Sequence, residues 1–247
     1  MPLVALHDDP LALKRGRSAP VSVVFRSGRR GPRNGSRIWL FDLDNTLHDA
    51  HAKIFPSMHD QINAYLMSRF GLTEEGANEM RRGFWARYGT TMNGLMRHHG
   101  TDPREFLAAT HQFPELADMV VHEAAVRHAL ARLPGRKLIF SNAPRHYVEG
   151  VVRALGVARF FDAVYTIENT RFKPKPSFQG FRVLLRRHHL DPRRCALVDD
   201  MLENLRTAKR LGMATVWVSP LRRRVPYVDL RITSVTELPG LVFRYSR

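Results

Sequence analysis

The stretch Ile38-Trp39-Leu40-Phe41, followed by Asp42-Leu43-Asp44-Asn45-Thr46, decides the fold of this 247-residue chain. The first four residues form a short apolar run of the kind that is buried within a sheet. The acidic and amide residues that follow are typical of a turn, because their side chains hydrogen-bond nearby backbone groups. The segment therefore predicts a buried strand that ends in an acidic turn.

The pattern of a short apolar run followed by polar residues returns later in the chain. These later runs are residues 137–140, 163–166, 195–198 and 214–218. Between them lie apolar stripes with helical spacing, one ending at Gly156 and another at Gly212. Strands that alternate with helices predict an α/β fold: a Rossmann-like parallel sheet with helices on both faces.

One long stretch interrupts this alternation. Residues 50–133 contain several helical stripes and no convincing strand. We therefore expect an α-helical cap over residues 50–133, inserted into a catalytic core formed by residues 36–49 and 134–247. A long insertion beside the polar end of the first strand is typical of a lid over a binding site.

The basic charge of the chain is spread along it: residues 1–37 carry eight basic and two acidic side chains, and the rest of the excess is scattered. Residues 1–35 show neither helical nor strand periodicity and predict a flexible basic tail, within a chain of net charge +16. Such a tail is compatible with nucleic-acid binding, and a basic surface could also attract an anionic, phosphorylated substrate. A simple solvated surface is favoured over both, because the chain has no zinc-finger spacing and no aromatic–basic RNA motif.

The composition excludes several classes of protein. With 44% hydrophobic and 25% charged residues, the chain is neither mainly disordered nor collagen-like. A single cysteine, Cys195, cannot form an internal disulfide, so we expect a reduced, cytoplasmic protein. No apolar run reaches the roughly 18 residues of a membrane helix, and we expect no membrane partner.

Polar side chains follow the apolar runs at places that are far apart in the sequence. They are Asp42 with Asp44, Ser141 with Asn142, Lys173 with Lys175, and Asp199 with Asp200. The carboxyl ends of parallel strands meet at one edge of a sheet, where ligands bind. Carboxylates that converge there repel one another unless a cation lies among them, and oxygen ligands select a hard ion such as Mg²⁺. A lysine and a hydroxyl beside that ion suit a phosphoryl group.

These four groups, in this order, resemble the four motifs of the haloacid dehalogenase (HAD) superfamily phosphohydrolases. The resemblance covers residues 37 to about 240 and implies a Rossmann-like core with a mobile cap at residues 50–133. It implies that Asp42 is a nucleophile that forms an aspartyl-phosphate, and that Asp44 protonates the leaving oxygen and then activates water. The dehalogenase branch lacks this second aspartate, so Asp44 favours phosphoryl chemistry over dehalogenation.

The same resemblance assigns the other polar groups. Mg²⁺ would bind the Asp42 carboxylate, the Asp44 main-chain carbonyl and Asp200. Asp199 would take part directly or through a water molecule. Ser141 and nearby backbone N–H groups would hold phosphoryl oxygens. We expect further phosphate or substrate contacts from Asn45, Thr46 and Asn142.

Two lysines compete for the third motif. In the family this motif is a Lys-Pro pair with an aromatic residue at the seventh position. Counted from Lys175, the seventh residue is Phe181, whereas counted from Lys173 it is Gln179. We therefore expect Lys175 to be catalytic and to bind phosphate, with Lys173 as the alternative.

Local similarities narrow the substrate. Residues 87–91, 94–100, 133–136 and 141–147 resemble the pyrimidine 5′-nucleotidase branch of the family. Residues 47–50 differ from it, because that branch more often has a tyrosine and a proline there. The resemblance implies a small phosphorylated metabolite as substrate, a pyrimidine nucleoside 5′-monophosphate such as UMP or CMP, with Tyr88 and Asn93 contacting the base. Phosphatase activity on phosphoglycolate or a sugar phosphate, and a mutase reaction, stay open.

Overall fold

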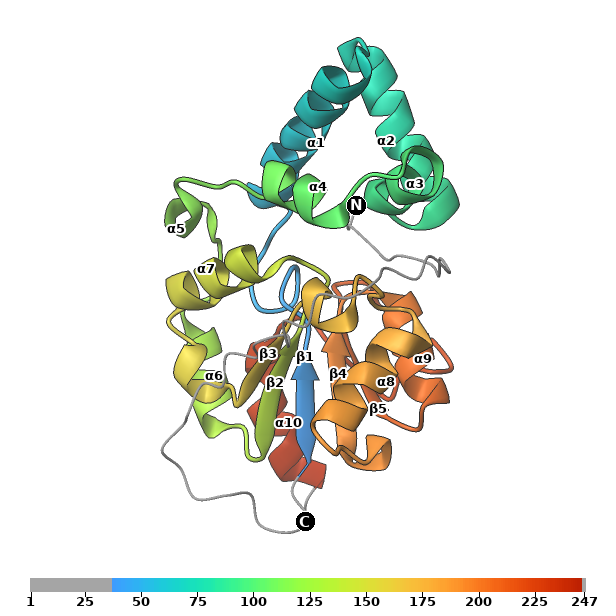
Figure 1. Cartoon of the computed structure of the whole chain (residues 1–247). Coiled ribbons are helices and arrows are strands. Elements are labelled where there is room, and N and C mark those ends of the chain that lie inside the picture. Colours follow the sequence, from blue (N-terminus) through green and yellow to red (C-terminus); the bar gives the residue numbers. More distant parts are fainter. Residues whose placement is uncertain (1–36, 246–247) are drawn as a thin grey trace.

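The computed structural model describes residues 37–245, so the tail expected over residues 1–35 lies outside the described residues. A six-stranded sheet forms the centre, and a group of helices stands beyond one edge of it (Figure 1). Every strand runs parallel to its neighbours, in the order β3-β2-β1-β4-β5-β6. The strands are β1 (Ile38–Phe41), β2 (Arg136–Phe140), β3 (Ala163–Tyr165), β4 (Cys195–Asp199), β5 (Ala214–Val218) and β6 (Leu230–Ile232).

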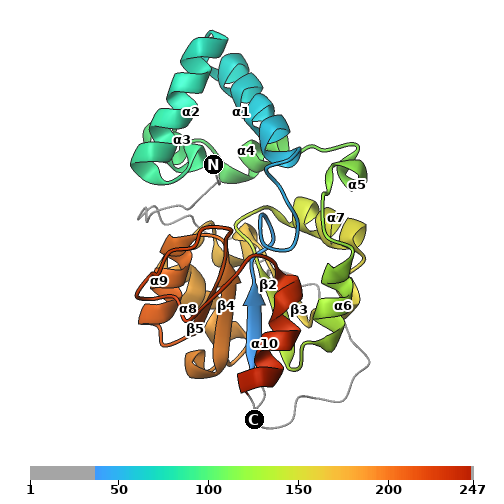
Figure 2. The same ribbon diagram turned by 180° about the vertical axis from the view of Figure 1, so that it is seen from behind.

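Both faces of the sheet are covered by helices, as Figure 2 shows from behind. On β1, Trp39 and Phe41 belong to the apolar cluster that includes residues of α6, α7 and α10. Ile38 and Leu40 point to the opposite face and join the cluster that includes residues of α8 and α9. Burial on both faces explains why β1 is apolar at every position. The predicted fold class is confirmed, although the short edge strand β6 was not predicted.

The helices fall into two groups. Those beyond the sheet edge are α1 (Ile54–Phe70), α2 (Glu74–Tyr88), α3 (Thr91–His99), α4 (Pro103–Thr110) and α5 (Leu116–Met119). Those nearer the sheet are α6 (Ala125–Arg132), α7 (Arg145–Leu155), α8 (Phe178–Arg187), α9 (Leu202–Arg210) and α10 (Leu238–Tyr245). Four short 3₁₀ helices complete the secondary structure of residues 37–245: η1 (Ala158–Phe160), η2 (Ile167–Thr170), η3 (Pro192–Arg194) and η4 (Val235–Glu237).

Local sequence sets the limits of the helices beyond the sheet. The side chains at the start of α2, α3 and α4 accept hydrogen bonds from backbone N–H groups of the first turn; they are Thr73, Thr90 and Asp102. Gly71 and Gly89 end α1 and α2 with φ angles of 65° and 78°, a left-handed conformation that glycine adopts without strain.

The two connections between the sheet and these helices meet. Asp49 N donates to Val121 O at 2.7 Å, and the two residues form an isolated antiparallel bridge. Lys53 Nζ also donates to the carbonyl of Asp118 at 2.9 Å. Helix α6, which the sequence interpretation put in the cap, packs against η4 and α10 instead. We therefore propose that the cap spans residues 50–120 and that α6 belongs to the core.

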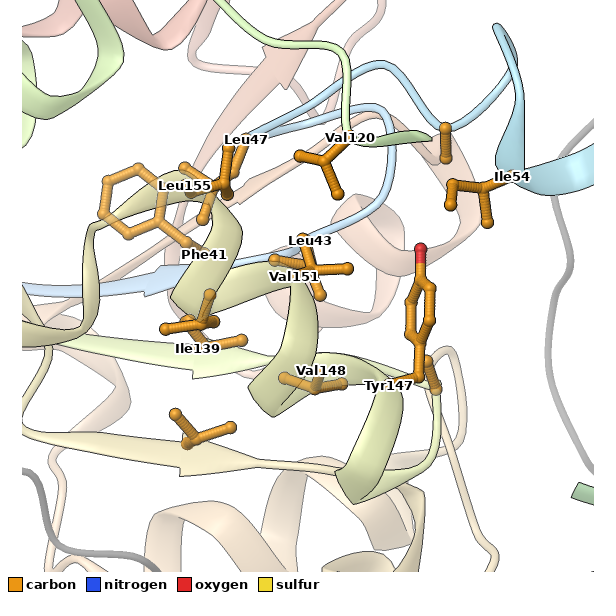
Figure 3. Packing of buried hydrophobic residues seen from close by; sticks show 14 of the residues in the cluster. Phe41, Leu43, Leu47, Ile54, Val120, Ile139, Tyr147, Val148, Val151 and Leu155 are labelled. Atoms are coloured by element: carbon orange, nitrogen blue, oxygen red, sulfur yellow. The ribbon is translucent and has the colours of Figure 1, made fainter. Parts of the chain in front are cut away.

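The loop after β1 is held in place by apolar packing against α7. Leu43 and Leu47 are buried beside Val148 and Val151 of α7 (Figure 3). Tyr147, on the same helix, is also buried, and its hydroxyl is directed away from Val148. This packing fixes the chain that carries the acidic turn. None of the helices described between residues 37 and 245 is both long and apolar enough to cross a membrane.

Candidate active site

The strand ends bring three carboxylates together. Asp42 follows β1, and Asp199 and Asp200 lie at the end of β4, which is hydrogen-bonded to β1. One carboxylate oxygen from each residue lies within 4.8 Å of the others. Asp42 N donates to Val198 O at 2.9 Å, so the ladder between the two strands extends to the site. Strand register therefore sets the distance between the carboxylates.

Lys175 lies between two of these carboxylates. Its Nζ is 2.8 Å from Asp42 Oδ1 and 2.7 Å from Asp199 Oδ2, and the side chain is 1% exposed. Burial alone lowers the pKa of Lys175, but the charges of Asp199 and Asp42 outweigh it and raise that pKa above its ordinary value. Lys175 is therefore a permanent cation in the site. Lys173 is only half-buried, and the structure places Lys175, not Lys173, against Asp42.

The Asn142 side chain fixes the backbone of Lys175. Asn142 Nδ2 donates to Lys175 O, and Lys175 N donates to Asn142 Oδ1, both at 2.9 Å. The side-chain amide thereby makes the two hydrogen bonds that a peptide group of a neighbouring strand would make. Ser141, one residue earlier, is buried at the end of β2, and its Oγ accepts from Ala143 N at 3.1 Å. Both residues line the pocket described below.

The two carboxylates at the end of β4 differ in their surroundings. Asp199 Oδ1 accepts from Met201 N and from Asn204 Nδ2, each at 2.9 Å. Asp199 Oδ2 accepts from Lys175 Nζ. Asp200 lines the pocket instead, and burial together with the charges of Asp199 and Asp42 raises its pKa to about 9. The chain therefore satisfies Asp199 with its own donors, whereas the charge of Lys175 and a backbone hydrogen bond compensate Asp200 only in part.

This donor set fits a divalent cation. Burial is the main cause that raises the pKa of Asp42 to about 7; the charge of Lys175 opposes it and that of Asp199 adds to it. One lysine cannot neutralise three clustered carboxylates, and a hard cation among their oxygens would favour the ionised forms. Oxygen donors without cysteine or histidine suit Mg²⁺.

A pocket lies between the sheet edge and the helices beyond it. Its floor includes Asp42, Asp44, Asn45, Ser141, Asn142 and Asp200. Its opposite wall comes from the helical insertion and is largely apolar: Phe55, Met58, Thr90, Thr91, Met92, Phe106, Leu107 and His111. Ala143, Ile167, Pro174, Met201 and Asn204 complete the lining. The arrangement places a charged floor opposite an apolar ceiling.

Four expected contact residues lie outside this lining, and one of them, Lys175, contacts Asp42 of the floor directly. The Asn93 amide donates to the Tyr88 carbonyl at 2.8 Å, so it joins α2 to α3 instead of entering the pocket. The Tyr88 hydroxyl pairs with His98 Nε2 at 2.5 Å on the cap surface. Thr46 is buried behind the acidic turn, and its Oγ1 has no hydrogen-bond partner among the described residues. The substrate contacts expected of Thr46, Tyr88 and Asn93 therefore stay predictions, and the pocket lining does not include these three residues.

The sequence interpretation missed several residues of the site. Asn204 donates to both oxygens of Asp199 and follows it by five residues, a spacing across the start of α9 that offered a weak signal. His48 and Tyr147 both contact Asp44. Nothing in the local pattern singled out His48, because its role depends on a loop that folds back on itself.

A family model for haloacid dehalogenase-like hydrolases matches residues 37–212, which include all four motifs. The chain belongs to this family. The match confirms the HAD resemblance and the hydrolase class that it implies. The match does not show to which branch of the family the chain belongs.

Two relatives of this HAD hydrolase are similar to it at low sequence identity. Phosphate metabolism protein 8 of Saccharomyces cerevisiae is 23% identical over 201 residues, covering 75% of this chain. The chain spans 62% of the length of that relative. A HAD phosphatase from Thermococcus onnurineus aligns with 83% of this chain and 97% of its own at a TM-score of 0.62 and 20% identity.

A second solved structure is similar over the same region. The putative HAD-hydrolase YfnB from Bacillus subtilis, whose structure was determined bound to magnesium, has a TM-score of 0.55 and 18% identity. The alignment covers 85% of this chain and 99% of the YfnB chain. At these identities the similarities show that the fold is shared.

Proposed function

We propose that this HAD hydrolase is a Mg²⁺-dependent phosphomonoesterase. The observation that carries the proposal is the buried group formed by Asp42, Lys175 and Asp200 at the strand edge, with Asp44 two residues after Asp42. A carboxylate nucleophile needs a neighbouring cation before it can approach an anionic phosphate. The site offers Lys175 for this purpose and a set of oxygen ligands for Mg²⁺.

The residues divide the chemistry between two steps. In the first, an Asp42 carboxylate oxygen bonds to phosphorus, the bond from phosphorus to the leaving oxygen breaks, and Asp44 gives that oxygen a proton. In the second, a water oxygen bonds to phosphorus, the bond to Asp42 breaks, and Asp44 takes a proton from the water. Atoms balance: one water enters, and an alcohol and a phosphate leave.

The remaining floor residues bind and orient the phosphoryl group. Lys175 is held in place by Asn142 and carries a fixed positive charge, so it stabilises the negative oxygens in both steps. Ser141 is placed to donate its hydroxyl proton to a phosphoryl oxygen. Asp42, Asp200 and the Asp44 carbonyl would hold Mg²⁺, with Asp199 behind them, and the ion would offset the charge of nucleophile and substrate.

The apolar ceiling supports a substrate with a flat, weakly polar leaving group. Phe55, Met92 and Phe106 offer surfaces on which a nucleobase can lie, whereas a sugar phosphate would need many hydrogen-bond partners. Thr90, Thr91 and His111 supply a few polar groups among them. We therefore propose a nucleoside 5′-monophosphate as substrate, with a pyrimidine base such as that of UMP or CMP.

A phosphate-release panel tests both levels of the proposal. UMP, CMP, AMP, GMP, phosphoglycolate and hexose phosphates are compared by kcat/KM with Mg²⁺ present and again after EDTA treatment. We expect the pyrimidine nucleotides to lead and EDTA to abolish turnover until Mg²⁺ is restored. Equal rates on all esters would remove the nucleotide assignment and leave the phosphatase. No phosphate release from any ester would remove both.

A further inference from the structure

Asp44 is held by two side chains that both reach the same oxygen. The Tyr147 hydroxyl donates to Asp44 Oδ1 at 2.5 Å, and His48 Nε2 lies 2.9 Å from that oxygen. Among the described residues no hydrogen bond to Asp44 Oδ2 is found, while Asp44 itself lines the pocket. The carboxyl group therefore has one occupied oxygen and one that is available to a ligand.

The two partners approach from rigid and buried surroundings. Tyr147 is 1% exposed in the apolar cluster between α7 and the loop after β1 (Figure 3). It lies 103 residues from Asp44 in the chain, on the helix that follows Ser141 and Asn142. His48 is 4% exposed in the loop that carries Asp44 itself. Neither side chain lines the pocket, so both contact Asp44 on the side that faces away from the pocket.

The donor and acceptor capacities of the atoms fix the direction of both hydrogen bonds to Asp44. A carboxylate oxygen only accepts, so the Tyr147 hydroxyl must donate, and burial raises the pKa of this tyrosine well above its ordinary value. His48 Nδ1 is buried and has no hydrogen-bond partner among residues 37–245, whereas Nε2 faces Asp44 Oδ1 at 2.9 Å. Because a carboxylate oxygen only accepts, the ring makes this contact by donating from Nε2.

We propose that Tyr147 and His48 are positioning residues for Asp44: by occupying Oδ1 with two donors, they present Oδ2 to the leaving group and to water. This inference rests on the phosphatase function proposed above. When the bond from phosphorus to the leaving oxygen breaks, its electron pair goes to that oxygen, and the proton comes from Asp44 Oδ2. When water attacks, its proton goes to the same Oδ2.

The cap contributes to this arrangement. His111, which follows α4, packs edge-on against the Tyr147 ring with centroids 5.9 Å apart. Phe113 lies against the same ring at 5.4 Å. The core side chain that orients Asp44 is thus enclosed by residues of the insertion.

A leaving-group comparison with Tyr147→Phe tests the proposal. 4-Nitrophenyl phosphate releases an anion that needs no proton, whereas phenyl phosphate releases one that does. If Tyr147 orients the acid, kcat/KM with phenyl phosphate falls about tenfold to a hundredfold, and kcat/KM with 4-nitrophenyl phosphate falls less than about threefold. This parameter reports the steps up to release of the leaving group, so it does not include the attack of water, which both esters share. Asp44→Asn sets the upper limit of this difference.

Matched controls separate positioning from general structural damage. Tyr165→Phe removes a buried hydroxyl that has no partner among the described residues, and it should leave both rates and the thermal midpoint unchanged. His48→Leu, which removes the second donor, should repeat the selective loss, and His48→Gln, which keeps an amide donor, should recover most of it. Thermal unfolding confirms that each variant is folded.

The outcomes distinguish the inference from the function on which it rests. Equal loss of kcat/KM with both esters in any folded Tyr147→Phe or His48→Leu variant overturns the positioning role and leaves the phosphatase standing. If the unmodified protein releases phosphate from neither aryl ester nor from the nucleotides, the proposed function itself fails. A selective loss with phenyl phosphate supports both.

Discussion

The floor and the ceiling of the pocket are built on different principles. The floor consists of strand ends, where Asp42 and Asp200 are brought together by the register of β1 and β4. The ceiling consists of helix faces, where Met92 and Phe106 are placed by the packing of α1 to α4 against one another. The first arrangement is fixed by hydrogen-bond ladders, and the second by side-chain shape. The floor should therefore tolerate almost no substitution, whereas the ceiling should tolerate changes that alter the choice of substrate.

The largest effect is expected at the nucleophile. Asp42→Asn keeps the shape of the side chain but removes the attacking carboxylate, so phosphate release should fall by about three or more orders of magnitude. Asp118→Asn, at an exposed position of the cap, is the control and should keep the unmodified rate. A rate for Asp42→Asn within tenfold of the unmodified protein would contradict the assignment of the floor.

The next effect concerns the buried cation. Lys175→Met keeps the apolar stem but leaves the carboxylates of Asp42 and Asp199 unpaired, so we expect about 3–5 kcal/mol less stability and about a hundredfold slower turnover. The matched Lys173→Met variant should lose less stability and less rate than Lys175→Met, because Lys173 is only half-buried and Lys175 is the lysine between the two carboxylates. Urea unfolding and phosphate release check both values. A greater loss of rate at Lys173 would reverse the choice between the lysines.

A smaller effect is expected from the ceiling, and it should appear as specificity. Met92→Ala removes part of the apolar wall, so the ratio of kcat/KM for UMP to that for phosphoglycolate should fall about tenfold. Met67→Ala is the matched control, because Met67 lies on α1 with 38% of its surface exposed. An unchanged ratio in Met92→Ala would mean that the ceiling does not contact the leaving group.

The smallest effect concerns pH and the contact between the two regions. Burial is the main cause that lowers the pKa of His111 from 6.5 to about 3; the neighbouring His146 adds to this and Asp44 opposes it. The unfolded chain therefore binds a proton below pH 6.5 that the folded chain refuses, so this site lowers stability as the pH falls. Between pH 8 and pH 6 we expect a loss of about 0.8 kcal/mol from this group.

His111→Gln removes that titration and serves as its own control. Urea unfolding of both proteins at pH 8 and pH 6 gives the difference directly. The variant should lose less stability than the unmodified protein over this interval. The same loss in both would show that His111 is accessible to protons in the folded chain.

The contrast also explains what the sequence could reveal. Short apolar runs followed by acids predicted the strands and their common edge, because strand order in a parallel sheet brings those ends together whatever the details. The positions of Tyr88 and Asn93 could not be predicted, because helical spacing indicates an apolar face but not which pocket it meets. Asn142 lines the pocket and also holds Lys175 through two backbone hydrogen bonds, a contact that the sequence pattern did not indicate. Tyr147 was hidden for a further reason, since its partner lies 103 residues away.

The pairing of Asp49 with Val121 has a consequence for how this protein can vary. The chain leaves the sheet and returns to it at a single point, so the length of the excursion does not constrain the position of any strand. A different set of helices, or a linker of a few residues, can join the same two positions without moving β1 or β2. Chemistry and selectivity can thus change independently, and exchange of residues 50–120 between relatives is a direct route to new substrates.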